Sequence, residues 1–211
     1  MGLLQTLLGR TKPVQADLDS LFALPSAALT LQSAAGLSTS GRAGVCYKPP
    51  TGQGFADMQA EVMRLLDMDG GGTLRTAGDA FGYHWVVVEN PDVEALVSQV
   101  HLVNSSLADA GWGPQLLCSV FGLAPVPAAT GDDELPSGVA GATVPGPGSV
   151  LPSTSYLVYL FKRGTFYPFA PVGDERRDNA AELRLKSLVA GDLAVEPELD
   201  RWFPLWDLPV G

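Results

Sequence analysis

Apolar segments of strand type come in pairs along this chain, and a helix pattern follows each pair. We expect strand pairs at 27–34 and 42–48, at 73–77 and 82–89, and at 155–162 and 165–169, with a further buried strand at 115–124. The apolar face of each pair must be covered, and the helix that follows offers one apolar stripe. The sequence therefore predicts an α+β fold, in which an antiparallel sheet built from strand-strand-helix units carries its helices on one face.

Two of these elements have the clearest local signals. Residues 83–89 form the strongest strand pattern, because aromatic and β-branched side chains favour strands. The segment 90–111 is the best helix, since Asn90 can cap it and Pro91 suits the first helical position. Further helices are expected from Phe55 to the glycines at 70–72, over 178–190, and over 17–24 with Asp17 as its cap and Pro25 as its stop.

The N-terminal residues 1–12 form an amphipathic segment. Its leucines have the spacing that places them on one face of a short helix, and they are Leu3, Leu4, Leu7 and Leu8. Such a helix can dock on the core or on a partner protein. With Arg10 and Lys12 nearby, it can also lie in a membrane interface.

The chain has 211 residues, of which 46% are hydrophobic, and this is enough for one domain with a sizeable core. We expect a single α+β domain over 1–211. Glycine and proline make up eleven of the 29 residues in 125–153, which predicts a flexible surface insertion, with a lid or a partner-binding segment as the alternative. Residues 197–211 form an aromatic tail, in which Pro204 excludes a regular helix.

The charge of the chain limits its partners. The formal net charge is -10 at pH 7, whereas a nucleic-acid binder needs a basic field, so we expect no nucleic-acid partner. Residues 1–48 carry four basic and two acidic side chains, a net charge of +2, and this allows a weak peripheral membrane contact through residues 1–10.

The cysteine content and the apolar runs indicate a compartment. Cys46 and Cys118 are too few for a disulfide scaffold, and no signal-peptide pattern is present. No apolar run reaches the roughly 18 residues of a membrane span. We therefore expect the protein in the cytoplasm or at the inner face of the membrane.

The residues that most often carry catalysis have structural interpretations here. His84 lies in an expected strand and His101 beside the apolar stripe of a helix, while both cysteines lie in expected strands, where buried thiols are inert. The sequence Asp67-Met-Asp69-Gly70 begins like a calcium loop but lacks the later oxygen ligands. We expect no enzyme, no metal and no cofactor, and the alternative is an enzyme with Cys118 or His84 in its site.

The C-terminal tail concentrates aromatic side chains. Trp202, Phe203 and Trp206 fall within five residues, and such side chains anchor many protein interfaces. Either the tail folds back on its own domain or it docks on another protein, and we expect at least one tryptophan to pack within the domain. The candidate partner-binding residues are Leu3, Leu4, Leu7, Leu8, Trp202, Phe203 and Trp206.

Three segments carry a family resemblance, namely Gly9-Arg-Thr-Lys-Pro13, the run LDSLFALPSA from Leu18, and Arg201-Trp-Phe-Pro-Leu-Trp206. With these segments the chain resembles the PspA-associated protein PspAB family, over most of its length. The resemblance implies a link to the phage-shock response to envelope stress, in which PspA-type proteins bind stressed membranes. It implies no catalytic residue.

The function that we expect from the resemblance is a non-enzymatic adaptor or regulatory partner in a PspA-type membrane-stress response. It would act through protein contacts, with a PspA-like protein or another member of the same system as its partner. The alternative is a domain similar to secretion chaperones, which hold extended segments of client proteins.

Overall fold

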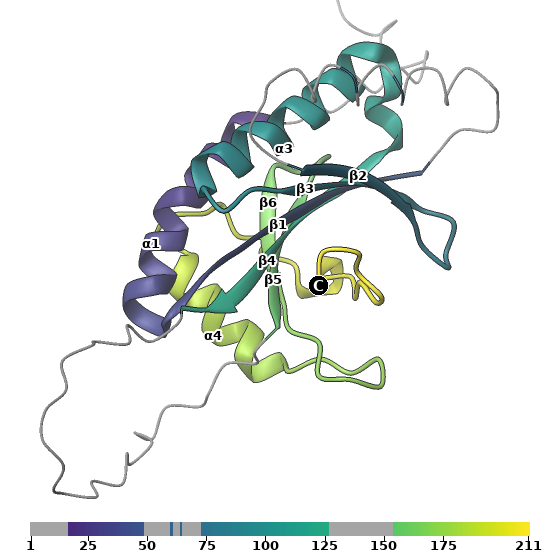
Figure 1. The fold of residues 1–211 in the computed structure, drawn as a ribbon. Coiled ribbons are helices and arrows are strands. Elements are labelled where there is room, and N and C mark those ends of the chain that lie inside the picture. Colours follow the sequence, from purple (N-terminus) through teal and green to yellow (C-terminus); the bar gives the residue numbers. More distant parts are fainter. Residues whose placement is uncertain (1–16, 49–59, 61–63, 65–72, 127–153) are drawn as a thin grey trace, which may run out of the picture.

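Six strands form one antiparallel sheet (Figure 1). The computed structural model describes residues 17–48, 60, 64, 73–126 and 154–211. The strands lie in the order β2-β3-β1-β4-β5-β6. Their bounds are Leu37–Tyr47 (β1), Thr73–Gly78 (β2), His84–Glu89 (β3), Leu116–Pro125 (β4), Ser155–Leu160 (β5) and Thr165–Phe169 (β6). All neighbouring strands are antiparallel, so the predicted sheet is confirmed.

Three helices cover one face of this sheet: α1 (Leu24–Ala35), α3 (Val93–Leu107) and α4 (Asn179–Val189) (Figure 1). A 3-10 helix, Leu18–Ala23, leads directly into α1. The helical layer and the sheet together give the α+β class that the sequence predicts.

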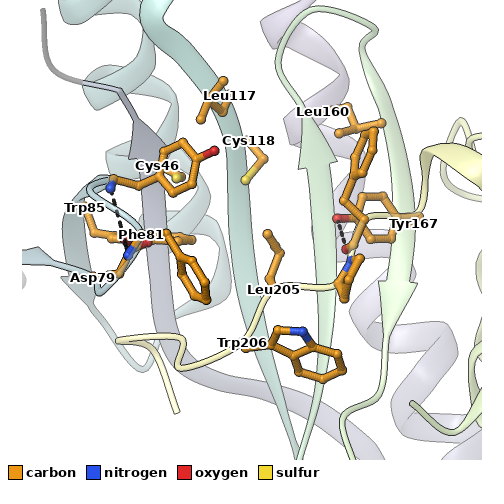
Figure 2. Close-up of a pocket in the computed structure, with 13 residues that line it drawn as sticks. Cys46, Asp79, Phe81, Trp85, Leu117, Cys118, Leu160, Tyr167, Leu205 and Trp206 are labelled. Carbon is orange, nitrogen blue, oxygen red and sulfur yellow. Dashed lines mark hydrogen bonds between the residues drawn. The ribbon is translucent and has the colours of Figure 1, made fainter. Parts of the chain in front are cut away.

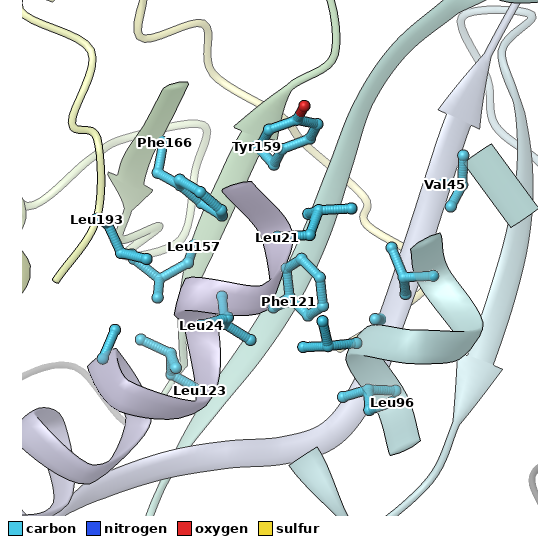
Figure 3. Close-up of a cluster of buried hydrophobic side chains, with 14 of the residues drawn as sticks. Leu21, Leu24, Val45, Leu96, Phe121, Leu123, Leu157, Tyr159, Phe166 and Leu193 are labelled. Atoms are coloured by element: carbon cyan, nitrogen blue, oxygen red, sulfur yellow. The ribbon is translucent and has the colours of Figure 1, made fainter. Parts of the chain in front are cut away.

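The main core lies between the helical layer and the sheet. Figure 3 shows Leu21 and Leu24 of the helical layer beside Phe121 of β4 and Leu157 of β5. Each of these four residues is at most 1% exposed. Because burial of a large apolar side chain contributes about 1.5–3 kcal/mol, this layer supplies much of the folding free energy.

In the first predicted strand pair, the strand at 42–48 is confirmed as part of β1, but the strand at 27–34 is wrong. Residues 27–34 belong to α1, in which Leu24, Ala27, Ala28 and Leu31 are buried at helical spacing. Pro25 does not stop a helix but lies in the first turn of α1, where its missing N–H costs nothing. Gly36 ends α1 in the left-handed conformation (φ 62°), and β1 begins at the next residue instead of at 42.

The start of α3 also differs from the prediction. Asp92, not Asn90, is the N-cap, and its Oδ1 accepts a hydrogen bond from the N–H of Ala95 at 2.8 Å. Asn90 Oδ1 accepts from the N–H of Asp92 and so shapes the turn before the helix. At the other end, the α-helical geometry stops at Leu107 and a π-helical turn, Ala108–Trp112, follows it.

The other predicted elements are confirmed within a few residues. The hairpin β2–β3, the strand β4 and the hairpin β5–β6 occur where the sequence places them. The helix predicted over 178–190 is α4, and Asp178 caps it by accepting from the N–H of Ala181. The tail contains only the 3-10 helix Leu199–Arg201 and otherwise irregular backbone.

Several predictions concern segments outside the described residues. They are the amphipathic segment 1–12, nearly all of the helix expected from Phe55, the glycines at 70–72, and residues 127–153 of the expected insertion. Among the residues that the structure describes, no helix combines the length and the apolar character that a membrane crossing requires.

Candidate functional site

The sheet face opposite the helices is also apolar. Its side chains alternate along each strand with those of the main core, as Trp85 and Val87 do on β3 and Tyr156 and Val158 do on β5. We call this the second face. The C-terminal segment, residues 202–211, covers part of it, and Val210 packs within its buried cluster.

Four side chains hold the C-terminal segment by its backbone carbonyl oxygens. Tyr167 Oη donates to the carbonyl oxygen of Phe203 (2.8 Å), and Arg42 Nη1 donates to that of Gly211 (2.9 Å). The guanidinium groups of Arg75 and Arg177 donate to the carbonyl oxygens of Pro209 and Trp202. The donors come from β6, β1, β2 and the connection between β6 and α4. The segment is therefore tied down across the width of the sheet.

The three aromatic candidates of the tail have different environments. Trp202 is 5% exposed, stacks on Tyr167 with 6.0 Å between ring centroids, and donates from Nε1 to the carbonyl oxygen of Glu196. Trp206 is partly buried, and its ring meets the ring of Phe169 edge-on at 5.3 Å. Phe203 is 55% exposed. The prediction that at least one tryptophan packs within the domain is confirmed for Trp202.

A pocket of about 520 Å³ lies between the second face and residues 203–206 (Figure 2). Its volume is in the range of sites that bind small molecules or the side chains of a partner. Most lining groups are apolar or aromatic, and the full lining is Cys46, Asp79, Phe81, Tyr83, Trp85, Leu117, Cys118, Leu160, Tyr167 and 203–206. Phe81 and Phe203 are 60% and 55% exposed, so they form the mouth of this pocket.

The loop between β2 and β3 forms one wall of the pocket, and Asp79 organises it. Asp79 Oδ1 accepts from the backbone N–H groups of Phe81 and Tyr83, both at 2.9 Å. Asp79 Oδ2 accepts from Trp85 Nε1 at 3.0 Å (Figure 2). Both oxygens of this carboxylate are thus engaged in holding the loop and the indole.

The two cysteines lie together in the pocket. Cys46 of β1 and Cys118 of β4 are directly opposite residues of the two central strands, and both are buried free thiols. The adjacent Cys118 side chain, and then burial, raise the pKa of the Cys46 thiol. At neutral pH Cys46 is therefore a protonated thiol and a poor nucleophile.

The remaining candidates lie elsewhere. His101 packs its ring on Phe22 at 4.9 Å, with Nε2 4.0 Å from Asp19 Oδ1, on the helical side of the sheet. The ring of His84 lies 6.0 Å from that of Tyr47 and does not line the pocket. The structure therefore does not bring either histidine to the two cysteines in this pocket. Leu3, Leu4, Leu7 and Leu8 lie outside the described residues.

The sequence analysis did not predict the pocket or its wall, because it considered only how the helices cover one face of the sheet. The signal was present in near-continuous apolar runs such as 83–88 and 156–161, in which both alternating sets of side chains are apolar. Such runs indicate that both faces of a sheet are covered. The tail was the remaining segment with enough aromatic surface to cover the second face.

These features define an α+β protein with helices on one sheet face and, on the other, an aromatic-lined pocket roofed by its own C-terminal segment. The chain belongs to the PspA associated protein B (PspAB) family, whose model matches residues 1–210. The family resemblance expected from the three segments is thereby confirmed, and the family name states an association with PspA. No curated protein and no solved structure matches the chain.

Proposed function

We propose that this protein is a non-enzymatic adaptor that binds a PspA-like partner at the mouth of the pocket on its second face. The observation that carries the proposal is the pair of exposed phenylalanines, Phe81 and Phe203, at the edge of a pocket with an apolar lining. Aromatic side chains around a preformed apolar hollow are typical of the energetic centre of a protein interface. The family's association with PspA supports a PspA-like protein as the partner.

The origin of the two phenylalanines supports a docking role. Phe81 comes from the loop that Asp79 fixes, and Phe203 follows directly after the anchored Trp202. Both exposed rings are therefore held by rigid neighbours. A partner that binds them loses little conformational entropy, which favours affinity.

The polar groups in the pocket form hydrogen bonds within the chain, and this supports a non-enzymatic role. The Asp79 carboxylate accepts three hydrogen bonds from its own chain, and Tyr167 Oη donates to the carbonyl oxygen of Phe203. The raised pKa of Cys46 keeps its thiol protonated. These groups serve to shape the pocket, and a partner's apolar side chain fits the surface that they leave.

Co-purification of the full chain with the PspA-like protein of the same cell, under native salt, tests this proposal. We expect one dominant partner at a fixed stoichiometry. Phe81→Ala and Phe203→Ala should each weaken binding about tenfold or more, as loss of an interface anchor does, without changing the melting temperature. Leu29→Ala is the matched control, since Leu29 is 69% exposed on α1, in the helical layer. Equal binding of the partner by the unmodified protein and by all three variants would contradict the proposal.

A second candidate function is the binding of extended client segments, as secretion chaperones do. It is favoured by β2, which ends the strand order and pairs only with β3 among the described strands. An edge strand can accept an added strand from another chain. The same co-purification separates the candidates, because a chaperone would retain many unfolded clients in place of one partner. A membrane contact through residues 1–10 stays a prediction.

A further inference from the structure

We infer that Cys46 and Cys118 form an oxidisable dithiol site, whose two thiols close to an intramolecular disulfide between β1 and β4 when a peroxide enters the pocket. The inference concerns a covalent modification of the pocket and does not depend on the identity of a partner.

The strand register places the two cysteines within reach of a disulfide. They are Cα partners in the antiparallel pair β1–β4, and both side chains lie on the second face. Opposite residues of an antiparallel pair have Cα atoms about 4.5 or 5.5 Å apart, depending on the hydrogen-bonding position. Both values fall within the 4.4–6.8 Å range, approximately, in which disulfides form. Both thiols also line the same pocket, so the two sulfurs face a common space.

The pocket gives a reagent access to this buried pair. Cys46 and Cys118 are only 3% and 6% exposed, yet both line the same 520 Å³ pocket (Figure 2). The pocket volume is many times that of a hydrogen peroxide molecule, so the pocket can hold this oxidant beside the two sulfurs. Burial and the raised pKa of Cys46 make the first attack on peroxide slow, but a sulfenic acid that forms beside a second thiol condenses with it to a reversible disulfide.

The reaction uses one peroxide for the two thiols. The sulfur of one cysteine attacks a peroxide oxygen, the O–O bond breaks, and the products are a sulfenic acid and one water. The second sulfur then attacks the sulfenic sulfur, the S–O bond breaks, and a second water leaves with the remaining thiol protons. Both sulfurs are oxidised, both peroxide oxygens are reduced, and β1 becomes covalently joined to β4.

Oxidation of the reduced full chain with hydrogen peroxide tests the inference by intact mass and by titration of free thiols in denaturant. We expect both thiols to disappear together, with a mass lower by two hydrogen atoms, no covalent dimer, and full reversal by dithiothreitol. The closed loop of more than seventy residues should raise the melting temperature by roughly 5–10 °C. The reaction should be faster at pH 9 than at pH 7, because the thiolate is the form that attacks peroxide and its fraction rises with pH.

Cys46→Ser and Cys118→Ser are the control variants, and neither should gain thermal stability on treatment with peroxide. The inference would be overturned by oxygen atoms added to either cysteine of the native protein, by disulfide-linked dimers, or by thiol loss that occurs only in urea. The mass and thiol measurements use the unmodified chain, so they test the inference even if a serine variant does not fold.

Discussion

Glu196 is a carboxylate whose side chain has no exposed surface. Burial alone would raise its pKa, but hydrogen bonds from the Arg163 guanidinium, from Thr165 Oγ1 and from the N–H of Glu198 hold that pKa below its ordinary value of 4.5. The residue also joins two parts of the molecule. Its own N–H donates to the carbonyl oxygen of Phe166, and its carbonyl oxygen accepts from the indole of Trp202.

We predict that Glu196→Gln lowers the free energy of unfolding at pH 7 by about 2 kcal/mol, because it removes a charged acceptor from a buried group. Arg163 is 36% exposed, so the loss is smaller than for a fully buried ion pair. A carboxylate with a depressed pKa stabilises the fold above the unfolded pKa, and this stability is lost as the pH falls through the folded pKa. Urea unfolding at several pH values should therefore show the difference between the two proteins shrinking below pH 4.5. A constant difference down to pH 2.5, approximately, would contradict this assignment.

Gly44 of β1 marks the place where the C-terminal segment presses on the second face. A Cβ atom at this position would lie 2.9 Å from Val210 Cγ1, closer than such atoms approach, and 3.1 Å from Trp85 Cε3, which is an unusually tight contact. We predict that Gly44→Ala destabilises the fold by about 1–3 kcal/mol, as overpacking does. Adding Val210→Ala should recover part of this loss in thermal melts. If the double variant is as unstable as the sum of the two single variants, Val210 does not pack there.

The C-terminal segment acts as a structural element although it has no regular secondary structure. Trp202 anchors it, and we predict that Trp202→Ala costs about 3–5 kcal/mol of stability, as loss of a buried large aromatic does. Phe203→Ala, one residue further, should leave the melting temperature unchanged because that ring is exposed. Calorimetry on the two variants measures both effects. Equal, small effects would mean that Trp202 is not part of the core in solution.

The first helix shows why one element was mistaken from the sequence. Leu29 and Leu31 alternate with polar residues, which is the pattern of a strand, and Thr30 favours strands. In the structure Leu29 is exposed, whereas Thr30 Oγ1 and Ser26 Oγ donate to the carboxylate of Asp192. This contact comes from far along the chain, so a local pattern cannot contain it. The hairpins β2–β3 and β5–β6 were predicted correctly because their pairing is local.

The candidate site could be predicted only in part for the same reason. The tail aromatics were visible as a cluster in the sequence, and Trp202, Phe203 and Trp206 all lie on the second face or at its pocket. The pairing of Cys46 with Cys118 depends on the register of β1 and β4, and this register shifts between Thr39 and Ala43 and again between Cys46 and Tyr47. A one-residue change in register would place the two thiols on opposite faces. No local signal fixes that register.

At the scale of the whole molecule, residues 127–153 link strands β4 and β5, which are direct neighbours in the sheet. Leu123 of β4 and Ser155 of β5 are Cα partners, so the two strand ends that flank this segment are already adjacent. We predict that replacement of 127–153 by a short Gly/Ser linker leaves the melting temperature within a few degrees of the parent. A loss of cooperative unfolding in the shortened chain would show that the segment is needed for folding.

The central claim is that a PspA-like partner binds at the pocket mouth, on the sheet face away from the helices. Site-specific photo-crosslinking tests it most directly, with p-benzoylphenylalanine placed at Phe81, at Phe203 or at the control position Leu29, each of which is exposed. The three proteins are irradiated with the purified PspA-like protein. We expect a covalent adduct of the two chains from positions 81 and 203 and none from position 29. Adducts from position 29 alone would place the partner on the helical layer and contradict the account.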